Sequence, residues 1–510
     1  MSDARVIVIG SGIAGLVSAT QLAHQGYAVT LIEAADSPGG KIRTVVVDGA
    51  PIDSGPTVFT MRWIFDQIFD SIGTQLESEV KIDALEVIAR HAWGDGARLD
   101  LYSEYERSLD AVAQFAGLEE AQNFKRFCEK IRNLYDVLQQ PFIQSASPTM
   151  LKMVTGLGLN GLTQLASIGA MSNLWNSLGR YFKNPRLLQL FARYATYCGS
   201  SPWQAPATLM MIAQVEMDGV WSVLGGMHAL ARAFERLALA RGANFRYNTR
   251  VEKILTKDGC VLGVQLSGGE VLTADAVIFN GDHAALSEGL LSPHDNQSNQ
   301  YKTPERSLSA LTWSINAKTS GFDLSRHNVF FQNHYQQEFD DIFQHQRLPQ
   351  TPTVYVCAQD RGTSVPVEGT EKLLCLVNAP AIGDSHQLTQ EAIESCEMKS
   401  FALLSQCGLE IDRTSRNTVR TTPVDFHRLF PATGGALYGQ ATHGWIVPLT
   451  RQKANSHIKG LMLAGGSVHP GPGVPMAAMS GQLAAAAVKA HLSSIKKFHP
   501  VATYGGMSMR

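Results

Sequence analysis

Charged side chains are scarce in this sequence, because Asp, Glu, Lys and Arg make up only 17% of its 510 residues, against about 25% in ordinary soluble proteins. The acidic and basic residues nearly balance, with a net charge of -2 at pH 7. Binding to nucleic acid requires a basic surface that neutralises phosphates. The composition therefore argues against nucleic acid as a partner, and the length allows two or three domains with a large core.

The sequence also lacks paired cysteines and long hydrophobic runs. Its seven cysteines form no C-x-x-C pair, and no spacing of Cys and His residues is typical of a metal site. We expect reduced thiols, as in a cytosolic protein, and no metal. No apolar run reaches the roughly 18 residues of a membrane span. The chain enters a predicted strand at once, so we expect no signal peptide.

What the sequence does have is a glycine-rich turn between an apolar run and an apolar helical pattern. Residues 5–9 predict a short buried strand, residues 16–25 place apolar side chains at helical spacing, and residues 28–32 predict a second buried strand. The turn that leads into the helix is Gly10-Ser-Gly-Ile-Ala-Gly15. This order predicts a βαβ unit, which is typical of an α/β dinucleotide-binding fold.

Each glycine of this turn has its own physical reason. Gly10 permits the tight turn, Gly12 lets the backbone approach a pyrophosphate, and Gly15 lets helix and strand pack closely. The helix start offers free N–H groups to phosphates, and an acid after the second strand can accept a hydrogen bond from a ribose hydroxyl. The alternative is a glycine-rich turn that binds nothing. The residues predicted to bind the dinucleotide are Gly10, Gly12, Ile13, Ala14, Gly15 and Glu33.

A second glycine-rich cluster follows, which a nicotinamide dehydrogenase does not need. It runs Ser37-Pro-Gly-Gly-Lys-Ile-Arg-Thr44, and Asp53-Ser-Gly-Pro-Thr57 comes soon after. These segments resemble the flavoprotein superfamily that includes amine oxidases and carotenoid desaturases. The resemblance implies FAD, with this glycine turn and Arg43 along its pyrophosphate and ribityl chain; a solvated loop is the alternative for Lys41 and Arg43. The predicted contacts are Gly39, Gly40, Lys41, Arg43, Gly55, Pro56 and Thr57.

Another strand–loop–helix pattern lies near the C-terminus. An apolar run leads into Gly465-Gly-Ser-Val-His-Pro-Gly-Pro-Gly-Val-Pro-Met476 and then an alanine-rich helical pattern to about residue 491. A helix start aimed at the flavin edge that becomes negative on reduction would favour reduction, and a purely structural loop is the alternative. The predicted contacts are Gly465, Gly466, Gly473, Val474 and Met476, and the resemblance of Thr249-Arg-Val251 adds Val251, beside the adenine.

Residues 141–179 are almost free of charge. Lys152 is the only charged residue among them, and glycines break their many large apolar residues into short predicted helices. Such a stretch can dip into one side of a membrane or line a tunnel for an apolar ligand. An ordinary buried helical layer or a subunit interface is the alternative, and the oligomeric state stays open.

Together these patterns predict an α/β protein with a Rossmann-type FAD-binding domain, similar to those of glutathione reductase and amine oxidases, a mixed-sheet substrate domain and a helical subdomain. Helices are expected over residues 62–72, 108–138, 228–241 and 391–406, and strands within 80–102 and over 309–317, 353–358 and 372–378. We assign residues 1–75, 220–295 and 455–510 to the FAD-binding domain, 76–105 and 296–454 to the substrate domain, and 106–219 to the helical, membrane-associating subdomain.

The closing motif, the Asp53–Thr57 segment and the N-terminal turn together resemble the carotenoid desaturase family, also called the phytoene desaturase family. Residues 56–63 and 469–476 resemble most its branch of bacterial 1-hydroxycarotenoid 3,4-desaturases, or methoxyneurosporene dehydrogenases. The resemblance implies desaturation of a 1-hydroxycarotenoid, in which flavin N5 takes a hydride and a C-3,4 double bond forms. The partner is then a long apolar carotenoid, and the enzyme is expected in the cytoplasm, peripheral on the inner face of the cell membrane.

Such a reaction needs few catalytic groups, because the conjugated chain spreads the developing positive charge. His469 is a candidate proton acceptor, with a structural histidine as the alternative, and Arg62 is a candidate contact to the ligand. Another carotenoid desaturase or a carotene isomerase is the nearest rival, and an amine oxidase shares the expected fold. From a different class, a GDI-like escort protein would bind prenylated partners without catalysis.

Overall fold

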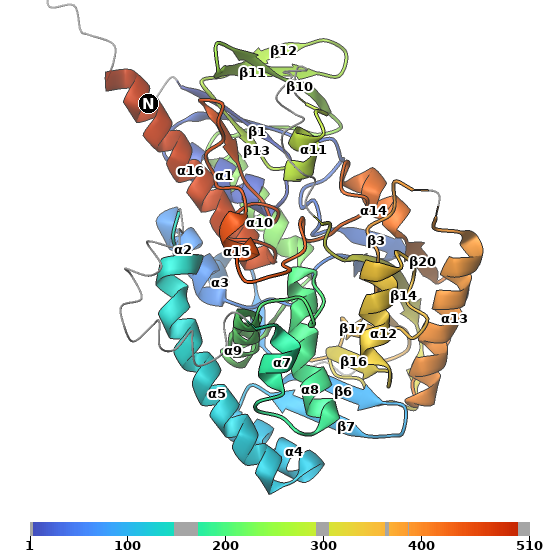
Figure 1. Cartoon of the computed structure of the whole chain (residues 1–510). Coiled ribbons are helices and arrows are strands. Elements are labelled where there is room, and N and C mark those ends of the chain that lie inside the picture. The colour runs from blue at the N-terminus through green and yellow to red at the C-terminus, as the bar shows by residue number, and fades with distance from the viewer. Residues whose placement is uncertain (1–3, 147–171, 292–304, 363–366, 386, 498–510) are drawn as a thin grey trace, which may run out of the picture.

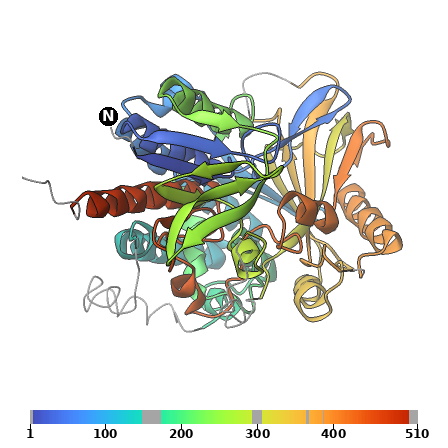
Figure 2. The same cartoon turned by 90° about the horizontal axis from the view of Figure 1, so that it is seen from above.

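The computed structural model describes residues 4–146, 172–291, 305–362, 367–385 and 387–497 (Figure 1). A parallel sheet and a mixed sheet organise this part of the chain and lie beside each other in both views (Figure 1 and Figure 2). Helices α16 (Val474–Lys497) and α13 (Gln390–Gln406) lie at opposite sides of the molecule. The predicted α/β class is confirmed.

The parallel sheet contains the predicted βαβ unit. Its strand order is β21-β13-β1-β2-β9, with all neighbours parallel. Both faces are covered, which explains the nearly continuous apolar runs: Val6 and Val8 pack against helices, whereas Ile7 and Ile9 pack against a small second sheet. The strands are β1 (Arg5–Ile9), β2 (Ala28–Ile32), β9 (Asn244–Arg246), β13 (Ala276–Phe279) and β21 (Leu461–Leu463).

Helices cover one face of the parallel sheet, and a three-stranded antiparallel sheet covers the other. Helices α1 (Ile13–His24), α10 (His228–Ala240) and α16 share one apolar cluster. The small sheet consists of β10 (Val251–Lys257), β11 (Cys260–Leu266) and β12 (Val271–Thr273). These helices and the two sheets are called the parallel-sheet half below.

The mixed sheet joins strands that lie far apart in the sequence. Its order is β20-β14-β18-β17-β16-β6-β7, antiparallel except between β16 and β6. Leu311, Trp313 and Ile315 of β14 pack with α13, so the alternate residue Thr312 belongs to the opposite face. The strands are β6 (Val87–Trp93), β7 (Arg98–Tyr102), β14 (Ser309–Ala317), β16 (His327–Phe331), β17 (Val354–Ala358), β18 (Glu371–Ala379) and β20 (Thr418–Thr421).

A helical region packs against β6 and β7 around an aromatic core that includes Phe124, Phe127 and Phe191. The single helix predicted over residues 108–138 is two helices, because Gly117 has a φ of +93° and ends the first of them. The elements are α4 (Tyr105–Ala116), α5 (Leu118–Leu138), η1 (Gln139–Ile143), α7 (Leu174–Leu178), α8 (Pro185–Ala192), η2 (Arg193–Cys198), η3 (Ala207–Met210) and α9 (Met211–Met217). Together with the mixed sheet and α13 they form the mixed-sheet half.

Most of the low-charge stretch predicted to meet a membrane, residues 147–171, lies outside the described residues. At its described ends, Phe142 and Ile143 pack against the core of the parallel-sheet half, and Leu174 and Leu178 are buried in the helical region. Among the helices that the structure describes, none has the length and apolar character needed to cross a membrane.

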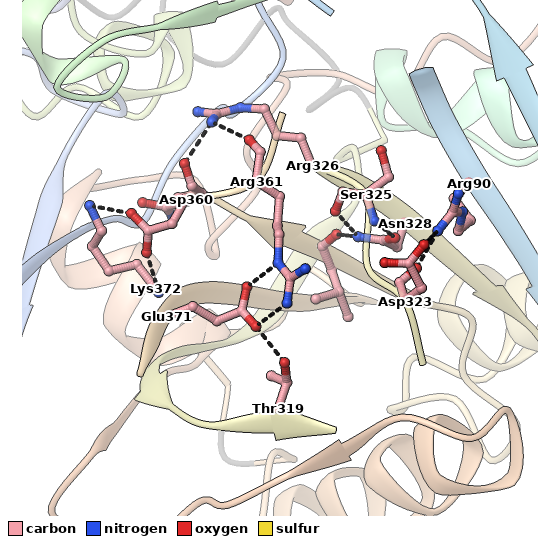
Figure 3. Close-up of polar contacts among 12 residues, drawn as sticks. Arg90, Thr319, Asp323, Ser325, Arg326, Asn328, Asp360, Arg361, Glu371 and Lys372 are labelled. Carbon is pink, nitrogen blue, oxygen red and sulfur yellow. Dashed lines mark hydrogen bonds and ion pairs between the residues drawn. The ribbon is translucent and has the colours of Figure 1, made fainter. Parts of the chain in front are cut away.

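Short elements and polar contacts join the two halves. Strand β4 (Ala50–Asp53) lies against β14 and β18, and the Gln359 amide bonds both the N–H and the C=O of Asp53, at 3.0 and 2.8 Å. Nearby, Arg361 pairs with the buried Glu371 at 2.9 Å (Figure 3). The remaining elements are β3 (Thr44–Val47), α2 (Arg62–Ser71), α3 (Leu76–Glu79), β5 (Ile82–Ala84), β8 (Trp221–Val223), α11 (His283–Ser287), β15 (Thr319–Ser320), α12 (Tyr335–Phe339), η5 (Asp340–Gln344), β19 (Glu410–Ile411), α14 (Pro423–Leu429) and α15 (Val447–Thr450).

Candidate active site

A cavity of about 1040 Å³ lies between the two halves. Its wall takes residues from the ends of β1, β2 and β13 on one side and from β14, β17 and β18 on the other. All but one of the predicted cofactor contacts line it, and the exception is Gly15. Those on the wall are Gly10, Gly12, Ile13, Ala14, Glu33, Gly39, Gly40, Lys41, Arg43, Gly55, Pro56, Thr57, Val251, Gly465, Gly466, Gly473, Val474 and Met476.

The first glycine turn is packed so tightly that side chains are excluded from it. Gly10 has a φ of +96°, and its N–H donates to the Ile32 carbonyl at 2.8 Å. A Cβ on Gly15 would lie 2.1 Å from the Gly10 oxygen, so Gly15 serves close packing behind the cavity wall. Helix α1 has no side-chain cap, which leaves its first N–H groups, next to Ile13 and Ala14, available to an anion.

Asn280, which follows β13, is a site residue that the sequence did not indicate. Its Nδ2 donates to the carbonyls of Gly10 and Gly12, both at 3.2 Å, and it lines the cavity. These bonds turn the two carbonyls toward Asn280 and hold the turn in shape. A signal existed, because the carboxyl ends of neighbouring parallel strands meet at one edge of a sheet, and β13 is the neighbour of β1.

Glu33 directly follows β2, and hydrogen bonds hold its carboxylate in place. Oε2 accepts hydrogen bonds from the N–H and the hydroxyl of Ser11, both at 2.7 Å, and Oε1 accepts from the Ala35 N–H at 2.9 Å. An acid held beside a glycine turn in this way fits a ribose hydroxyl.

The second glycine cluster lies directly against the first. The Gly39 N–H donates to the Ser11 carbonyl at 2.9 Å, and a Cβ on Gly40 would lie 3.2 Å from the Gly12 Cα. A Cβ on Gly55 would lie 1.9 Å from the Lys41 oxygen. Three chain segments thus meet backbone to backbone, which only glycine permits.

Lys41 and Arg43 are not in a solvated loop. The Lys41 ammonium donates to the Leu437 carbonyl at 2.7 Å, and Arg43 Nη2 donates to the Thr421 hydroxyl at 3.0 Å. Burial lowers the pKa of both groups, and Arg43 Nε has no partner among the described residues. Two cations with donors to spare are thereby held at the cavity wall, as a pyrophosphate requires.

The C-terminal motif reaches the same cavity because α16 packs on α1. A Cβ on Gly481 would lie 2.3 Å from the Ala14 oxygen, and the Ser18 hydroxyl donates to the Gly481 carbonyl at 2.9 Å. Strand β21 pairs with β13 in the parallel sheet. The N-terminal glycine turn and the C-terminal motif, far apart in the sequence, thus form one wall of the cavity.

His469 lies on the closing loop but does not line the cavity. Its buried ring places Nε2 2.8 Å from the Ser145 carbonyl oxygen and packs edge-on against Phe142. Burial lowers its pKa. These contacts fix the loop to the end of η1, so the geometry favours the structural alternative over a proton acceptor.

Arg62 also lies away from the cavity wall. At the start of α2 it pairs with Asp66 at 3.2 Å and with Glu77 at 2.7 Å. Both carboxylates are partly or largely exposed, so the guanidinium is drawn toward solvent. The structure thus places Arg62 outside the lining of the cavity, and its contact with a ligand stays a prediction. No group of three or more His, Cys, Asp or Glu side chains gathers as metal ligands anywhere in the described ranges.

The glycine-rich segments of residues 10–15, 39–43, 53–57 and 465–476, together with Glu33, are called the cradle below. The cradle fits a dinucleotide, because it combines an uncapped helix start, a fixed acid at the ribose position and two cations. Its glycine segments also pack so closely that side chains are excluded. Residues 13–489 match the family described as flavin-containing amine oxidoreductases. The chain belongs to this family. Its cofactor is accordingly FAD, as predicted.

Relatives narrow this assignment within the flavin-containing family. The chain is 56% identical to hydroxyneurosporene desaturase of Rubrivivax gelatinosus over 99% of its own length and 97% of the relative's. It is 29% identical to the 1-hydroxycarotenoid 3,4-desaturase of a Flavobacterium, covering 94% and 98%. It therefore belongs with the carotenoid desaturases, which confirms the predicted family. Putrescine oxidase shares the fold, with a TM-score of 0.64 at 15% identity, covering 96% and 99%.

Beyond the glycine-rich cradle, the same cavity continues over the mixed sheet. Its floor includes the neighbouring residues Thr312, Leu376, Tyr355 and Val329, which the register aligns across four strands. Most of the surrounding side chains are apolar. They include Met61, Phe142, Ile143, Leu209, Met211, Ile212, Val215, Leu374 and Leu437.

One part of this wall is ionic, and sequence reasoning missed it. Arg193 of η2 pairs with Glu216 of α9 at 3.0 Å, with both side chains buried. Glu216 also accepts from the Tyr194 hydroxyl at 2.6 Å and from the Tyr197 hydroxyl. Arg193 and Tyr197 line the cavity, whereas Tyr194 and Glu216 lie behind them. A lone acid in the apolar helix α9 was the only local signal.

Tyr355 carries a second polar group into the cavity. Its hydroxyl lies 2.7 Å from the Thr57 hydroxyl and 2.7 Å from Nδ1 of His327. Burial, aided by Arg326 and Arg193, lowers the pKa of His327 to about 3. The imidazole is therefore neutral at pH 7, and the three groups form an uncharged hydrogen-bonded chain.

Proposed function

We propose that this protein desaturates a 1-hydroxycarotenoid with FAD and introduces a double bond between C-3 and C-4. The observation that carries the proposal is a single cavity in which the glycine-rich cradle continues into a mostly apolar chamber. The names of the relatives support the substrate class. A long polyene fits such a chamber, whereas a compact amine needs a small polar one.

The chemistry is a hydride abstraction coupled to loss of a proton from the adjacent carbon. Bound FAD supplies the hydride acceptor at N5. The protein's share is to hold the polyene, to exclude water with the apolar wall, and to keep the reacting carbons in register. No residue is assigned as catalytic base, since His469 is held by Ser145 and the polyene itself stabilises positive charge.

We infer the roles of the cradle residues from their positions. The first turn of α1 and the Gly39–Gly40 turn would hold the pyrophosphate, Glu33 the ribose, and Val251 the adenine. The residues around Gly465 and Met476 would border the flavin ring. Residues 1–75, 220–295 and 455–510 would then act as the FAD-binding domain, 76–105 and 296–454 as the substrate domain, and 106–219 as the helical subdomain.

We also propose that the enzyme collects its substrate from the inner face of the cell membrane. Forty carbons at roughly 0.8 kcal/mol each amount to about 30 kcal/mol of transfer free energy, so the free polyene in water is negligible. Residues 141–179 are nearly uncharged, and Trp445 and Ile446 are 40% and 46% exposed, close in sequence to Pro448 on the cavity wall.

Product analysis tests the substrate. Purified holoprotein would be incubated with 1-hydroxyneurosporene, neurosporene, lycopene and phytoene while the polyene absorption is followed. We expect a red shift with 1-hydroxyneurosporene, because each added conjugated double bond lowers the excitation energy. A red shift with phytoene instead, or isomerisation without a change in mass, would assign the chain to another desaturase or an isomerase.

Liposome co-sedimentation tests the membrane proposal. Lysines introduced among the apolar residues between 150 and 171 should weaken binding at least about tenfold, whereas Met398→Lys on the exposed face of α13 should not. Equal binding of both variants would refute it. A GDI-like escort is the remaining alternative, and purified protein that stays colourless after addition of FAD would favour it.

A further inference from the structure

A hydrocarbon cavity has no need of an ionic wall. Covering Arg193 and Tyr197 with a polyene would remove them from water, and buried polar groups are costly unless each is hydrogen-bonded. The neighbouring wall residues Leu209, Ile212 and Val215 show that an apolar lining was available at this place. The ionic wall is therefore unexplained by the hydrocarbon part of the substrate.

The wall has hydrogen-bonding capacity to spare. The Tyr197 hydroxyl donates to Glu216 and accepts from Arg193 Nη1 at 3.1 Å, which leaves one lone pair on its oxygen. Arg193 Nη1 carries two N–H groups, and its one hydrogen-bond acceptor among the described residues is the Tyr197 hydroxyl. One acceptor and one donor are thus left over, which matches an alcohol, because an alcohol both donates and accepts.

The ionic wall faces the same cavity as the cofactor cradle, because Arg193, Tyr197, Tyr355 and Thr57 all line it. Tyr355 is bonded to Thr57 at 2.7 Å, in the segment predicted along the cofactor. A ligand that lies in this cavity can therefore reach both the cradle and Arg193.

We propose that Arg193 and Tyr197 bind the hydroxyl group of the carotenoid and thereby select the bond that is desaturated. This inference rests on the proposed function. Only three bonds separate the oxygen on C-1 from C-3, so a pocket for the hydroxyl has to open into the cavity that holds the reacting carbons, and Arg193 and Tyr197 line that cavity. With the oxygen held, C-3 and C-4 lie in register with the hydride acceptor.

The same pocket discriminates against polyenes without a hydroxyl. A hydrocarbon end group would cover the remaining acceptor of Tyr197 and the remaining donor of Arg193 without pairing them, and sites built around a substrate hydroxyl reject analogues that lack it. Selection thus comes from two polar side chains on a mostly apolar wall.

Two tyrosines offer a matched pair of variants. Tyr194 and Tyr197 both donate to Glu216 and both are removed as donors by substitution with Phe, but only Tyr197 lines the cavity. Equilibrium binding of 1-hydroxyneurosporene and of neurosporene would be followed by quenching of protein fluorescence in holoprotein. We expect wild type to prefer the hydroxylated ligand at least about tenfold, Tyr197→Phe to reduce this preference about tenfold, and Tyr194→Phe to keep it.

Product analysis adds a second measurement. Tyr197→Phe should spread the new double bond over neighbouring positions, whereas Tyr194→Phe should retain C-3,4. If wild type binds neurosporene as tightly as 1-hydroxyneurosporene, or if Tyr197→Phe keeps the full preference, the hydroxyl pocket is refuted. Failure of wild type to desaturate 1-hydroxyneurosporene at all would instead refute the proposed function, so the two failures are distinguishable.

Discussion

The two walls of the cavity are built by different means. The parallel-sheet wall is largely backbone, with glycines at Gly12, Gly40 and Gly55 bringing chain segments together. The mixed-sheet wall is made by side chains, from Leu376 and Val329 to the buried pair of Arg193 and Glu216. A backbone wall suits a cofactor shared by a whole family, whereas a side-chain wall can change with the substrate.

The largest effect is expected on the backbone wall, at Gly15. In Gly15→Ala the new Cβ would lie 2.1 Å from the Gly10 oxygen, so α1 has to move away from the turn. We expect protein without FAD, measured as the ratio of flavin to protein absorbance after purification. Gly179→Ala, where a Cβ has ordinary contacts, is the control. Full flavin content in Gly15→Ala would contradict the close-packing role.

The second largest effect is expected on the pH dependence of stability, at Glu338 behind the side-chain wall. Burial raises the pKa of this carboxyl to about 7. Because the unfolded carboxyl titrates near 4.5, the folded state holds its proton to higher pH, and stability from this group is lost as pH rises from about 4.5 to 7. Relative to Glu338→Gln, wild type should lose about 3 kcal/mol of unfolding free energy over this range.

Urea unfolding of both proteins at pH 4.5, 6 and 8 measures this loss. Met398→Gln on the exposed face of α13 provides a control, since it changes no ionisable group and should run parallel to wild type at every pH. A constant difference between wild type and Glu338→Gln would show that Glu338 does not titrate in this range.

Asn280 contributes a side chain to the backbone wall. Asn280→Ala removes the donors to the Gly10 and Gly12 carbonyls, and we expect about 2 kcal/mol, or roughly 30-fold, weaker FAD binding. Asn280→Asp should be worse, because a carboxylate would face two carbonyl oxygens. Fluorescence titration of apoprotein with FAD measures both, and equal affinity of Asn280→Asp and wild type would remove Asn280 from the cradle.

The smallest effect is expected at His469. Its hydrogen bond to Ser145 predicts that His469→Asn costs about 1 kcal/mol of stability and changes turnover by less than about threefold. Loss of a general base would lower turnover by a hundredfold or more. Single-turnover flavin reduction by substrate separates the two, and a hundredfold slower reduction would restore His469 as proton acceptor.

The contrast between the walls also explains what the sequence revealed. Glycine spacing is local, so the sequence could indicate the glycine-rich segments between Gly10 and Thr57 and between Gly465 and Met476, which line the cavity, together with the parallel sheet. The ionic wall was not predictable, because Arg193, Glu216 and Tyr355 come from separate segments that meet only after folding. His469 was placed correctly on its loop, but its partner Ser145 could not be inferred.

For Arg62, the local sequence did not indicate where the side chain points. Proximity in sequence to the Gly55–Thr57 segment suggested a contact with the ligand, but the start of α2 directs this side chain toward Asp66 and Glu77. Likewise, the periodicity over residues 108–138 did not reveal the break at Gly117, since both flanking helices carry the same pattern.

The packing of Gly481 on Ala14 has a consequence for biosynthesis. During translation the first βαβ unit leaves the ribosome more than 400 residues before β21 and α16, which complete its sheet and cover its first helix. The nascent unit therefore exposes an unfinished sheet edge and an apolar helix face until the last segment arrives. Loading of the prosthetic group thus becomes a late event, and a prematurely terminated polypeptide remains without it.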